Sequence, residues 1–322
     1  MVLFFNRTKS FTHSGQSKIA RGSRGLLPRL RFVDLMKPFN SRGYPLDTSI
    51  LFILPGLIGF FVFFIGPFII SLGYAFVDKP VGGVFVGFQN FTELFQNKAY
   101  LQGLNNTISF IGVSVPLNVL LSLAVAMLIS KVKKYKGLFA LIFLIPLVIP
   151  SGSMVFFWRA FFDHNGYANF LLNLLGVAKI NWLETEYVQF VIVLIFIWKN
   201  LGYNMVLFLA GLYSIPKDYY EAAYIDGAGP WQCFRHITAV HLMPTFVLVL
   251  IMSIINSFKV FKEIYLITGS YPHESIYMLQ HFMNNMFYSL NYQKLATATT
   301  VLVLIITLLT KFLLKLERKV SP

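Results

Sequence analysis

The chain has 322 residues, of which 56% are hydrophobic, 17% aromatic and only 12% charged, and its formal net charge at pH 7 is +14. Soluble domains have about 25% charged residues, so this composition cannot cover a surface that faces water, and we expect lipid to be the solvent. The single cysteine, Cys233, excludes an intramolecular disulfide and a cysteine-rich zinc site.

Uncharged windows of roughly 20 residues mark the segments that can cross a bilayer core about 30 Å thick. In chain order, the six expected spans cover residues 49–76, 106–130, 137–162, 187–213, 244–268 and 295–314. We therefore predict an all-α integral membrane protein with a transmembrane domain over residues 49–316. A basic tail, residues 1–48, precedes this domain, and a short tail, residues 317–322, follows it.

The lysine and arginine residues lie mostly on one side of the expected spans. The connections and tails on that side hold nineteen of them, and those on the opposite side hold four. Because positively charged segments are retained in the cytoplasm, this distribution predicts that both termini are cytoplasmic. It also argues against a nucleic-acid partner, since the basic residues flank apolar runs as they do at a membrane face. The basic tail is either a solvated leader that fixes topology or a segment attracted to anionic lipid.

The connection between the fourth and fifth spans, residues 214–244, is neither lipid-like nor typical of disorder. We expect a short helix here that begins near Tyr219, is capped by Asp218 and ends at Gly227. The charge distribution places this helix on the cytoplasmic face.

Within this connection, Glu221-Ala222-Ala223 is followed after three residues by Gly227, and after nine more by Ile237. This spacing resembles the signature of permease subunits in binding-protein-dependent ABC importers. The resemblance implies a coupling helix that fits a groove on a separate ATPase subunit, with small alanines on one face and a sharp turn at the glycine. The alternative is an interfacial amphipathic turn with no partner. The residues assigned to coupling are Glu221, Ala222, Ala223, Asp226, Gly227 and Ile237.

The resemblance extends over about residues 51–319 and points to the carbohydrate branch of the family. Other segments that resemble this branch are Leu54-Pro55-Gly56, residues 86–91, Ile145-Pro146 with Ile149-Pro150, and residues 226–232. The chain departs from the family at Ala239 and Val240, where relatives usually have Leu-Pro. The resemblance implies a bacterial cytoplasmic-membrane protein that carries a sugar or oligosaccharide. The implied partners are a homologous second permease, an ATP-binding-cassette ATPase dimer and an extracellular solute-binding protein.

No phosphate-binding loop of the Gly-x4-Gly-Lys-Ser/Thr type occurs in the sequence. We therefore expect no catalytic residue, metal or cofactor in this chain, with ATP and Mg bound by the partner ATPase. The rival interpretation is a transporter or channel that works alone. Such carriers generally show intramembrane acids and paired repeats. Here the expected spans contain only Glu263, near an end, and no repeat is visible.

The resemblance to maltose-type permeases assigns the solute path to residues of the fourth and fifth spans. These residues are Lys199, Asn200, Tyr203, Ser253, Asn256 and Ser257. Asn256 lies twelve residues after Pro244, or roughly 18 Å at helical rise, which is near the middle of a bilayer.

Four of the path residues have an alternative role. Ser253, Asn256 and Ser257 could instead form hydrogen bonds between helices. Lys199 could pair with an acid on a partner permease or contact an anionic or hydroxylated solute. Lys259, Lys262 and Glu263 are expected to reach the outer interface, and Arg159 to anchor the chain at an interface.

Overall fold

A computed structural model describes residues 46–320, with side chains described for residues 53–318. The basic tail therefore lies almost entirely outside the described residues. The chain divides into two units, residues 1–59 and 60–322. The described part of the first unit is helical and belongs to α1 (Leu46–Phe60).

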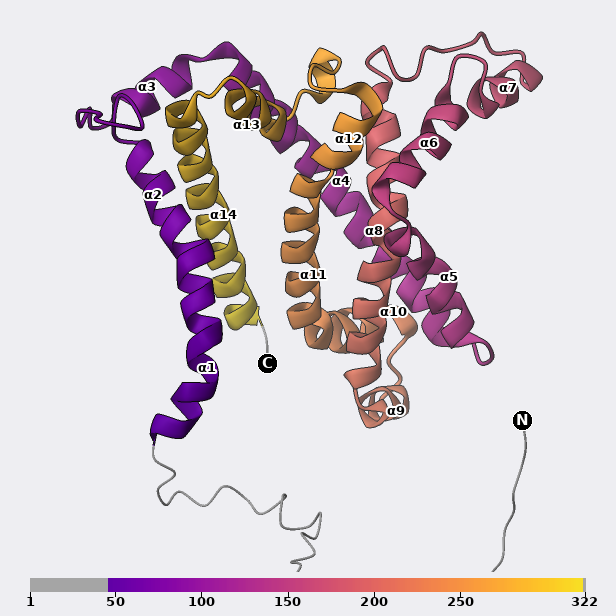
Figure 1. Cartoon of the computed structure of the whole chain (residues 1–322). Coiled ribbons are helices and arrows are strands. Elements are labelled where there is room, and N and C mark those ends of the chain that lie inside the picture. Colours follow the sequence, from indigo (N-terminus) through magenta and orange to yellow (C-terminus); the bar gives the residue numbers. More distant parts are fainter. Residues whose placement is uncertain (1–45, 321–322) are drawn as a thin grey trace, which may run out of the picture. The chain divides into compact units, whose positions relative to one another are not determined.

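The second unit is helical apart from its connections and one isolated antiparallel bridge between Val77 and Phe85. Figure 1 shows its helices in chain order. They are η2 (Phe61–Ile65), α2 (Gly66–Tyr74), α3 (Gln89–Gln96), α4 (Lys98–Lys131), α5 (Lys136–Val148), α6 (Ser151–Phe162), α7 (Tyr167–Leu174), α8 (Val188–Ser214), α9 (Lys217–Ile225), α10 (Pro230–Cys233), η3 (Phe234–Thr238), α11 (Ala239–Lys259), α12 (Phe261–Thr268), η4 (Glu274–Ile276), α13 (Leu279–Tyr288) and α14 (Tyr292–Val320).

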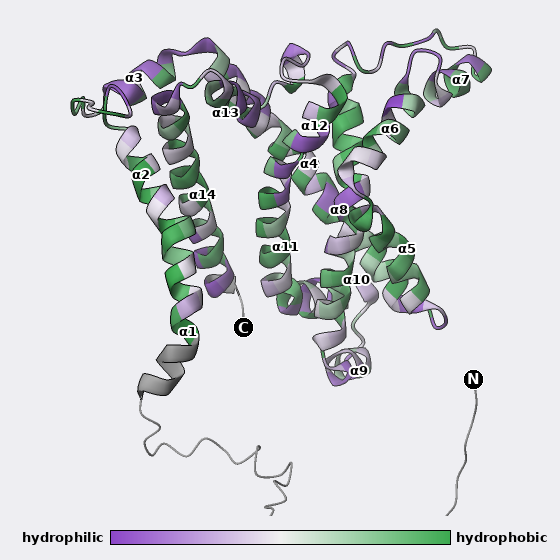
Figure 2. Ribbon diagram, in the orientation of Figure 1, coloured by the Kyte–Doolittle hydropathy of each residue, from purple (hydrophilic) through white to green (hydrophobic). Residues whose placement is uncertain are grey.

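Within the described residues, five helical stretches are long and apolar enough to cross a membrane, and a bent pair of helices could supply a sixth. The five are Ile53–Tyr74, Lys98–Lys131, Val188–Ser214, Pro230–Thr268 and Tyr292–Arg318. Figure 2 shows long hydrophobic stretches along these helices and more hydrophilic residues in several end segments, including α3, α9 and α13. The all-helical prediction is confirmed.

The predicted third span, residues 137–162, is wrong as a continuous helix. The chain forms α5 and then α6 together with α7, and the two parts are bent by 92° at a short break. The break falls at Ile149 and Pro150. Proline disfavours helical geometry in the residue before it and lacks the N–H that would continue the ladder, so the helix stops and restarts.

The predicted start of the fifth span at Pro244 is also wrong. Pro244 lies inside α11, which begins at Ala239 and continues without interruption from α10 and η3. The second span likewise begins at Lys98, eight residues before its predicted start at 106. Hydropathy detects the apolar middle of a helix, whereas the helix continues into polar turns at its ends.

The core of the second unit lies where α4, α8 and α11 pack together. Its apolar part includes the edge-to-face pair of Phe110 on α4 and Phe196 on α8, with ring centroids 5.5 Å apart. Buried polar side chains cross the same interface: Asn204 Nδ2 donates to Asn118 Oδ1 at 2.9 Å and to Ser253 Oγ at 2.8 Å. Polar groups that lipid would leave unpaired therefore bond one helix to the next.

A glycine allows α8 to approach α5 closely. A Cβ added at Gly202 would overlap the carbonyl oxygen of Phe143, which is backbone and cannot rotate away. We predict that Gly202→Ala lowers the free energy of unfolding by about 1–3 kcal/mol, because the two helices must separate. Thermal unfolding of the protein in detergent micelles measures the effect.

Gly112→Ala is the matched control. Gly112 is also helical, in α4, but no atom lies within 4 Å of a Cβ added there. Since alanine is the better helix former by about 1 kcal/mol, this change should be neutral or stabilising. Equal melting temperatures for the two variants would show that the α5–α8 contact is not close.

Candidate functional site

The predicted coupling helix exists as α9, and its start differs from the expectation. Pro216 occupies the N-cap position with an extended backbone, and no side chain caps the helix. Asp218 is therefore not the cap; it lies in the first turn, where a negative charge is favourable next to the helix N-terminus. The preceding Ile215 is buried and fixes the end of α8 to the core.

The predicted end of α9 at Gly227 is confirmed. Gly227 has φ +80°, a left-handed conformation that glycine adopts without steric cost. The amide of Ala228 donates to the carbonyl of Ala223 at 2.9 Å, and that of Gly227 donates to Tyr224 at 3.1 Å. The chain thus reverses within a few residues and enters α10 at Pro230.

None of the nine residues of α9 is buried. Glu221, Ala222 and Asp226 are exposed, and Ala223 is half-buried. A nine-residue helix with so little burial gains little stability from its own chain, since short helices depend on packing. Figure 1 shows α9 at the end of α8, beyond the core of the second unit.

Four of the six predicted coupling residues meet at one hollow. A depression of about 350 Å³ is lined by Ala223, Asp226, Gly227 and Ile237, together with the start of α10 and the face of η3. Glu221 and Ala222 do not line it. The motif spacing thus brings a helix end and the following turn of η3 around one concave surface, with Glu221 beside it on the exposed helix.

Two tyrosines that the sequence did not single out attach α9 to the spans. The Tyr220 hydroxyl lies 2.9 Å from Thr238 Oγ1, and the Tyr219 ring stacks on His241 with centroids 5.1 Å apart. Both partners lie at the start of the long stretch that becomes α11. Displacement of α9 would therefore be transmitted to α8 through the backbone and to α11 through these contacts.

The predicted path residues divide into two sets. Lys199, Asn200 and Asn256 line a cavity of about 250 Å³ between α8 and α11, together with Lys259 and Glu263. The other three, Tyr203, Ser253 and Ser257, do not line this cavity.

The hydroxyls of the two serines are used within the protein. The buried Ser253 accepts from Asn204 in the interhelical network, and Ser257 Oγ donates to the carbonyl of Ile254 at 2.6 Å. Asn118 and Asn204, which complete the network, were not predicted as site residues. Asn204 lies one helical turn after Asn200, and that spacing was the signal in the sequence.

Lys199 pairs with an acid of its own chain. Its ammonium group forms an ion pair with Glu263 on α12 and donates to Ser151 Oγ at 3.0 Å. Ser151 Oγ in turn donates to Glu263 Oε1 at 2.9 Å. Glu263 is 3% exposed, so the expectation that it reaches the outer interface is wrong. Burial of this carboxylate is tolerated because a cation and a hydroxyl both bond to it.

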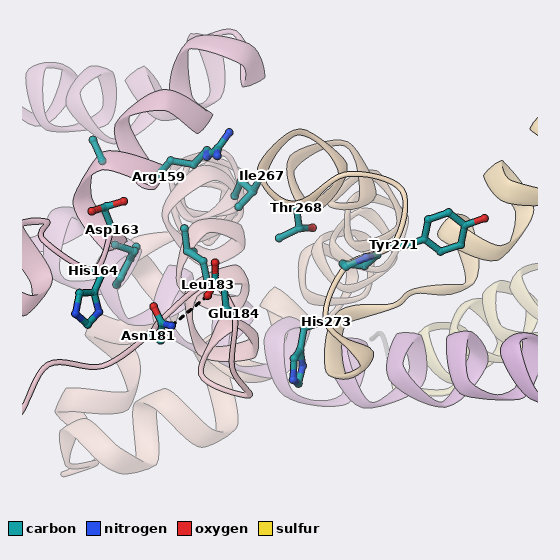
Figure 3. Close-up of a pocket in the computed structure, with 13 residues that line it drawn as sticks. Arg159, Asp163, His164, Asn181, Leu183, Glu184, Ile267, Thr268, Tyr271 and His273 are labelled. Atoms are coloured by element: carbon teal, nitrogen blue, oxygen red, sulfur yellow. Dashed lines mark hydrogen bonds between the residues drawn. The ribbon is translucent and has the colours of Figure 1, made fainter.

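A larger cavity, of about 730 Å³, lies where the 163–184 connection meets the end of α12, at the opposite end of the spans from α9 (Figure 1, Figure 3). Arg159, Asp163, Glu184 and His273 line it, and Figure 3 shows these polar side chains around the opening. Arg159 is exposed here. Within the described part of the chain, no three His, Cys, Asp or Glu side chains are close enough together to hold a metal ion.

The comparisons with known proteins agree with the motif. Residues 81–321 match the family described as the binding-protein-dependent transport system inner membrane component. The trehalose/maltose transport system permease protein MalF of Thermococcus litoralis is 36% identical over 69% of this chain and 77% of its own length. The arabinooligosaccharides transport system permease protein AraP of Bacillus subtilis is 36% identical over 67% of this chain and 71% of its own length. The lactose transport system permease protein LacF of Rhizobium radiobacter is 29% identical over 84% and 94%.

Among solved structures, the fold is similar to a chain of a bacterial ABC transporter involved in the import of the acidic polysaccharide alginate. The TM-score is 0.75 at 23% identity, over 86% of this chain and 96% of that one. At this identity the likeness shows the fold alone. Since the family match covers most of the sequence, this chain belongs to the inner-membrane components of binding-protein-dependent transport systems.

Proposed function

We propose that this chain is one of two homologous permease subunits that together line the path of an ATP-driven importer for a sugar or oligosaccharide. A separate ATP-binding-cassette dimer binds ATP and Mg and hydrolyses the nucleotide, and an extracellular binding protein delivers the solute. The observation that carries the proposal is α9, an exposed helix without buried side chains that follows α8 along the chain and contacts the start of the α11 stretch through Tyr219 and Tyr220.

The relatives support the solute class. Those named above are described as permeases for trehalose or maltose, arabinooligosaccharides and lactose. A second structure of similar fold, 22% identical with a TM-score of 0.74, is an alginate transporter in complex with a pentasaccharide-bound periplasmic protein. Membership of the family supports the importer over a transporter or channel that works alone.

In this proposal α9 fits a groove of the ATPase on the cytoplasmic side, and both termini lie on that side. The charge distribution supports this orientation, because the sequence assigns nineteen basic residues to segments on the same side as residues 214–244 and four to segments on the other side. Glu221 and Ala222 lie on the exposed helix, with Ala223, Asp226, Gly227 and Ile237 around the adjoining hollow. Closure of the ATPase dimer displaces α9. The backbone link to α8 and the Tyr219 and Tyr220 contacts transmit this displacement to α8 and α11, which form the walls of the path.

The path itself is proposed to pass Lys199, Asn200 and Asn256, which line the cavity between α8 and α11. Tyr203, Ser253 and Ser257 are also assigned to the path by the proposal, although they do not line this cavity. The two serines are buried and bond to neighbouring protein atoms, so they stabilise the helices behind the cavity rather than offer free hydroxyls to the solute.

The coupling role predicts the effect of Glu221→Lys. An exposed carboxylate that meets a basic groove contributes about 1.5 kcal/mol or more, and reversal of its charge also adds repulsion. We expect uptake by the reconstituted complex to fall by about tenfold or more, while the chain still inserts and α9 still forms. Solute uptake and co-purification of the ATPase measure the two effects.

Glu317→Lys is the control for Glu221→Lys, because it makes the same charge change near the carboxyl end of α14, on the side to which the proposal assigns α9. It should leave uptake and ATPase binding within twofold of wild type. Normal uptake and normal ATPase association in Glu221→Lys would contradict the coupling role.

The ion pair between Lys199 and Glu263 predicts a second set of effects. Lys199→Met leaves a buried carboxylate without its cation, which should cost about 3–5 kcal/mol of stability. Glu263→Gln added to Lys199→Met removes the uncompensated charge and should restore most of the loss. Melting temperatures of the two variants in detergent measure the difference.

Lys262→Met controls for the loss of a lysine, since Lys262 is exposed one residue before Glu263. It should melt within a few degrees of wild type. If the double variant were less stable than Lys199→Met alone, Glu263 would not be the structural partner of Lys199.

A further inference from the structure

The cavity between α8 and α11 contains more basic than acidic groups. Its ionisable lining residues are Lys199, Lys259 and Glu263, which gives a formal charge of +1. The charge of Glu263 is compensated by Lys199. Lys259 bonds only to an amide, since its Nζ donates to Asn256 Oδ1 at 3.0 Å and no described carboxylate forms an ion pair with it.

The cations face the cavity more than the anion does. The side chain of Lys199 is 21% exposed, whereas that of Glu263 is 4% exposed. Glu263 thus lies behind the lysine and holds it at the wall, together with Ser151. An entering solute meets the ammonium group of Lys199 rather than the carboxylate.

The hydrogen-bonding capacity of the wall favours acceptors on the solute. A lysine ammonium group has three N–H donors. Lys199 uses donors on Ser151 and Glu263, and Lys259 uses one on Asn256, so both retain donors. The Asn256 oxygen is occupied by Lys259. Asn200 Nδ2 donates to the carbonyl of Phe196 at 2.9 Å, which leaves the Asn200 oxygen as an acceptor beside the donors of the two ammonium groups. Cationic donors bind an anionic acceptor more strongly than a neutral hydroxyl.

Lys259 lies at the end of α11, in a helical stretch of 39 residues that is longer than the bilayer core. A lysine without an acid partner is tolerated there where its ammonium group reaches water, at the interface or in a water-filled path. The rest of the wall is mostly apolar, from Leu147, Ile195 and Phe196, and so suits the apolar face of a pyranose ring.

On these grounds we infer that the solute is an acidic sugar, and that Lys259, with Lys199 held by Glu263, binds its anionic group. The inference rests on the proposed importer function and adds the charge of its substrate. A carboxylate and a phosphate offer the same acceptor chemistry to the two lysines.

The test uses the full complex, reconstituted in vesicles with its own partner subunits and binding protein. Three probes are compared: trigalacturonic acid, the neutral galactotriose of the same linkage, and glucose 6-phosphate. We expect uptake of at least one anionic probe to exceed that of galactotriose by about tenfold or more, and the two anionic probes distinguish a carboxylate from a phosphate.

Variants at Lys259 test whether this cavity causes the preference for anionic over neutral probes. Lys259→Gln should reduce the ratio of anionic to neutral uptake by about tenfold, and Lys259→Arg should keep it within about threefold of wild type. Lys262→Gln is the matched control, because Lys262 is exposed nearby and does not line the cavity.

Three results would overturn the inference, and one of them also identifies a failure of the importer function. Uptake of galactotriose in preference to both anionic probes would leave the importer standing and make its solute neutral. Loss of the second permease from purified Lys259→Gln complexes would make Lys259 a contact between subunits instead. Absence of ATP-dependent uptake for all three probes would count against the importer itself.

Discussion

Lipid offers no hydrogen-bond partner to a polar side chain, and this constraint organises the core of the second unit. Asn118, Asn204 and Ser253 come from three different helices and bond to each other, and Lys199, Glu263 and Ser151 do the same across α8, α12 and α6. These bonds pair polar atoms from different helices, while Asn118 Nδ2 and Asn204 Oδ1 have no partner among the described residues. The helices are held in register by these contacts, whereas apolar contacts between helices compete with equivalent contacts to lipid.

In contrast to the core, the coupling helix α9 is not held by buried polar contacts. The side chains of α9 are not buried, and the Tyr219 and Tyr220 contacts together with the buried Ile215 attach it to the neighbouring helices. Such a helix is stabilised little by its own chain, and its exposed surface is available for another protein. The same contacts and the backbone connect α9 to both α8 and α11, whose polar residues line the cavity. One displacement would therefore act on both walls.

The two lysines of the cavity differ in whether a partner in the protein compensates their charge. Lys199 has an acid partner and a hydroxyl partner, and its charge is thereby compensated inside the bundle. Among the described residues Lys259 has only an amide partner, and it remains exposed at the wall. A charge that is not compensated in a membrane-spanning stretch is retained where a ligand or water can meet it.

The sequence by itself determined the approximate positions of the apolar stretches, the family and the turn at Gly227, because each depends on local composition or on fixed spacing along the chain. The length of an uncharged apolar stretch indicates whether it can cross a membrane, and a left-handed backbone conformation favours glycine. The tertiary structure decided which polar residues meet. Glu263 lies 64 residues from Lys199 and Asn118 lies 86 from Asn204, and nothing in the local pattern specifies these pairs. The 92° bend between α5 and the segment of α6 and α7 has a local cause in Pro150, but hydropathy does not detect it because its value is the same for a straight and a broken span.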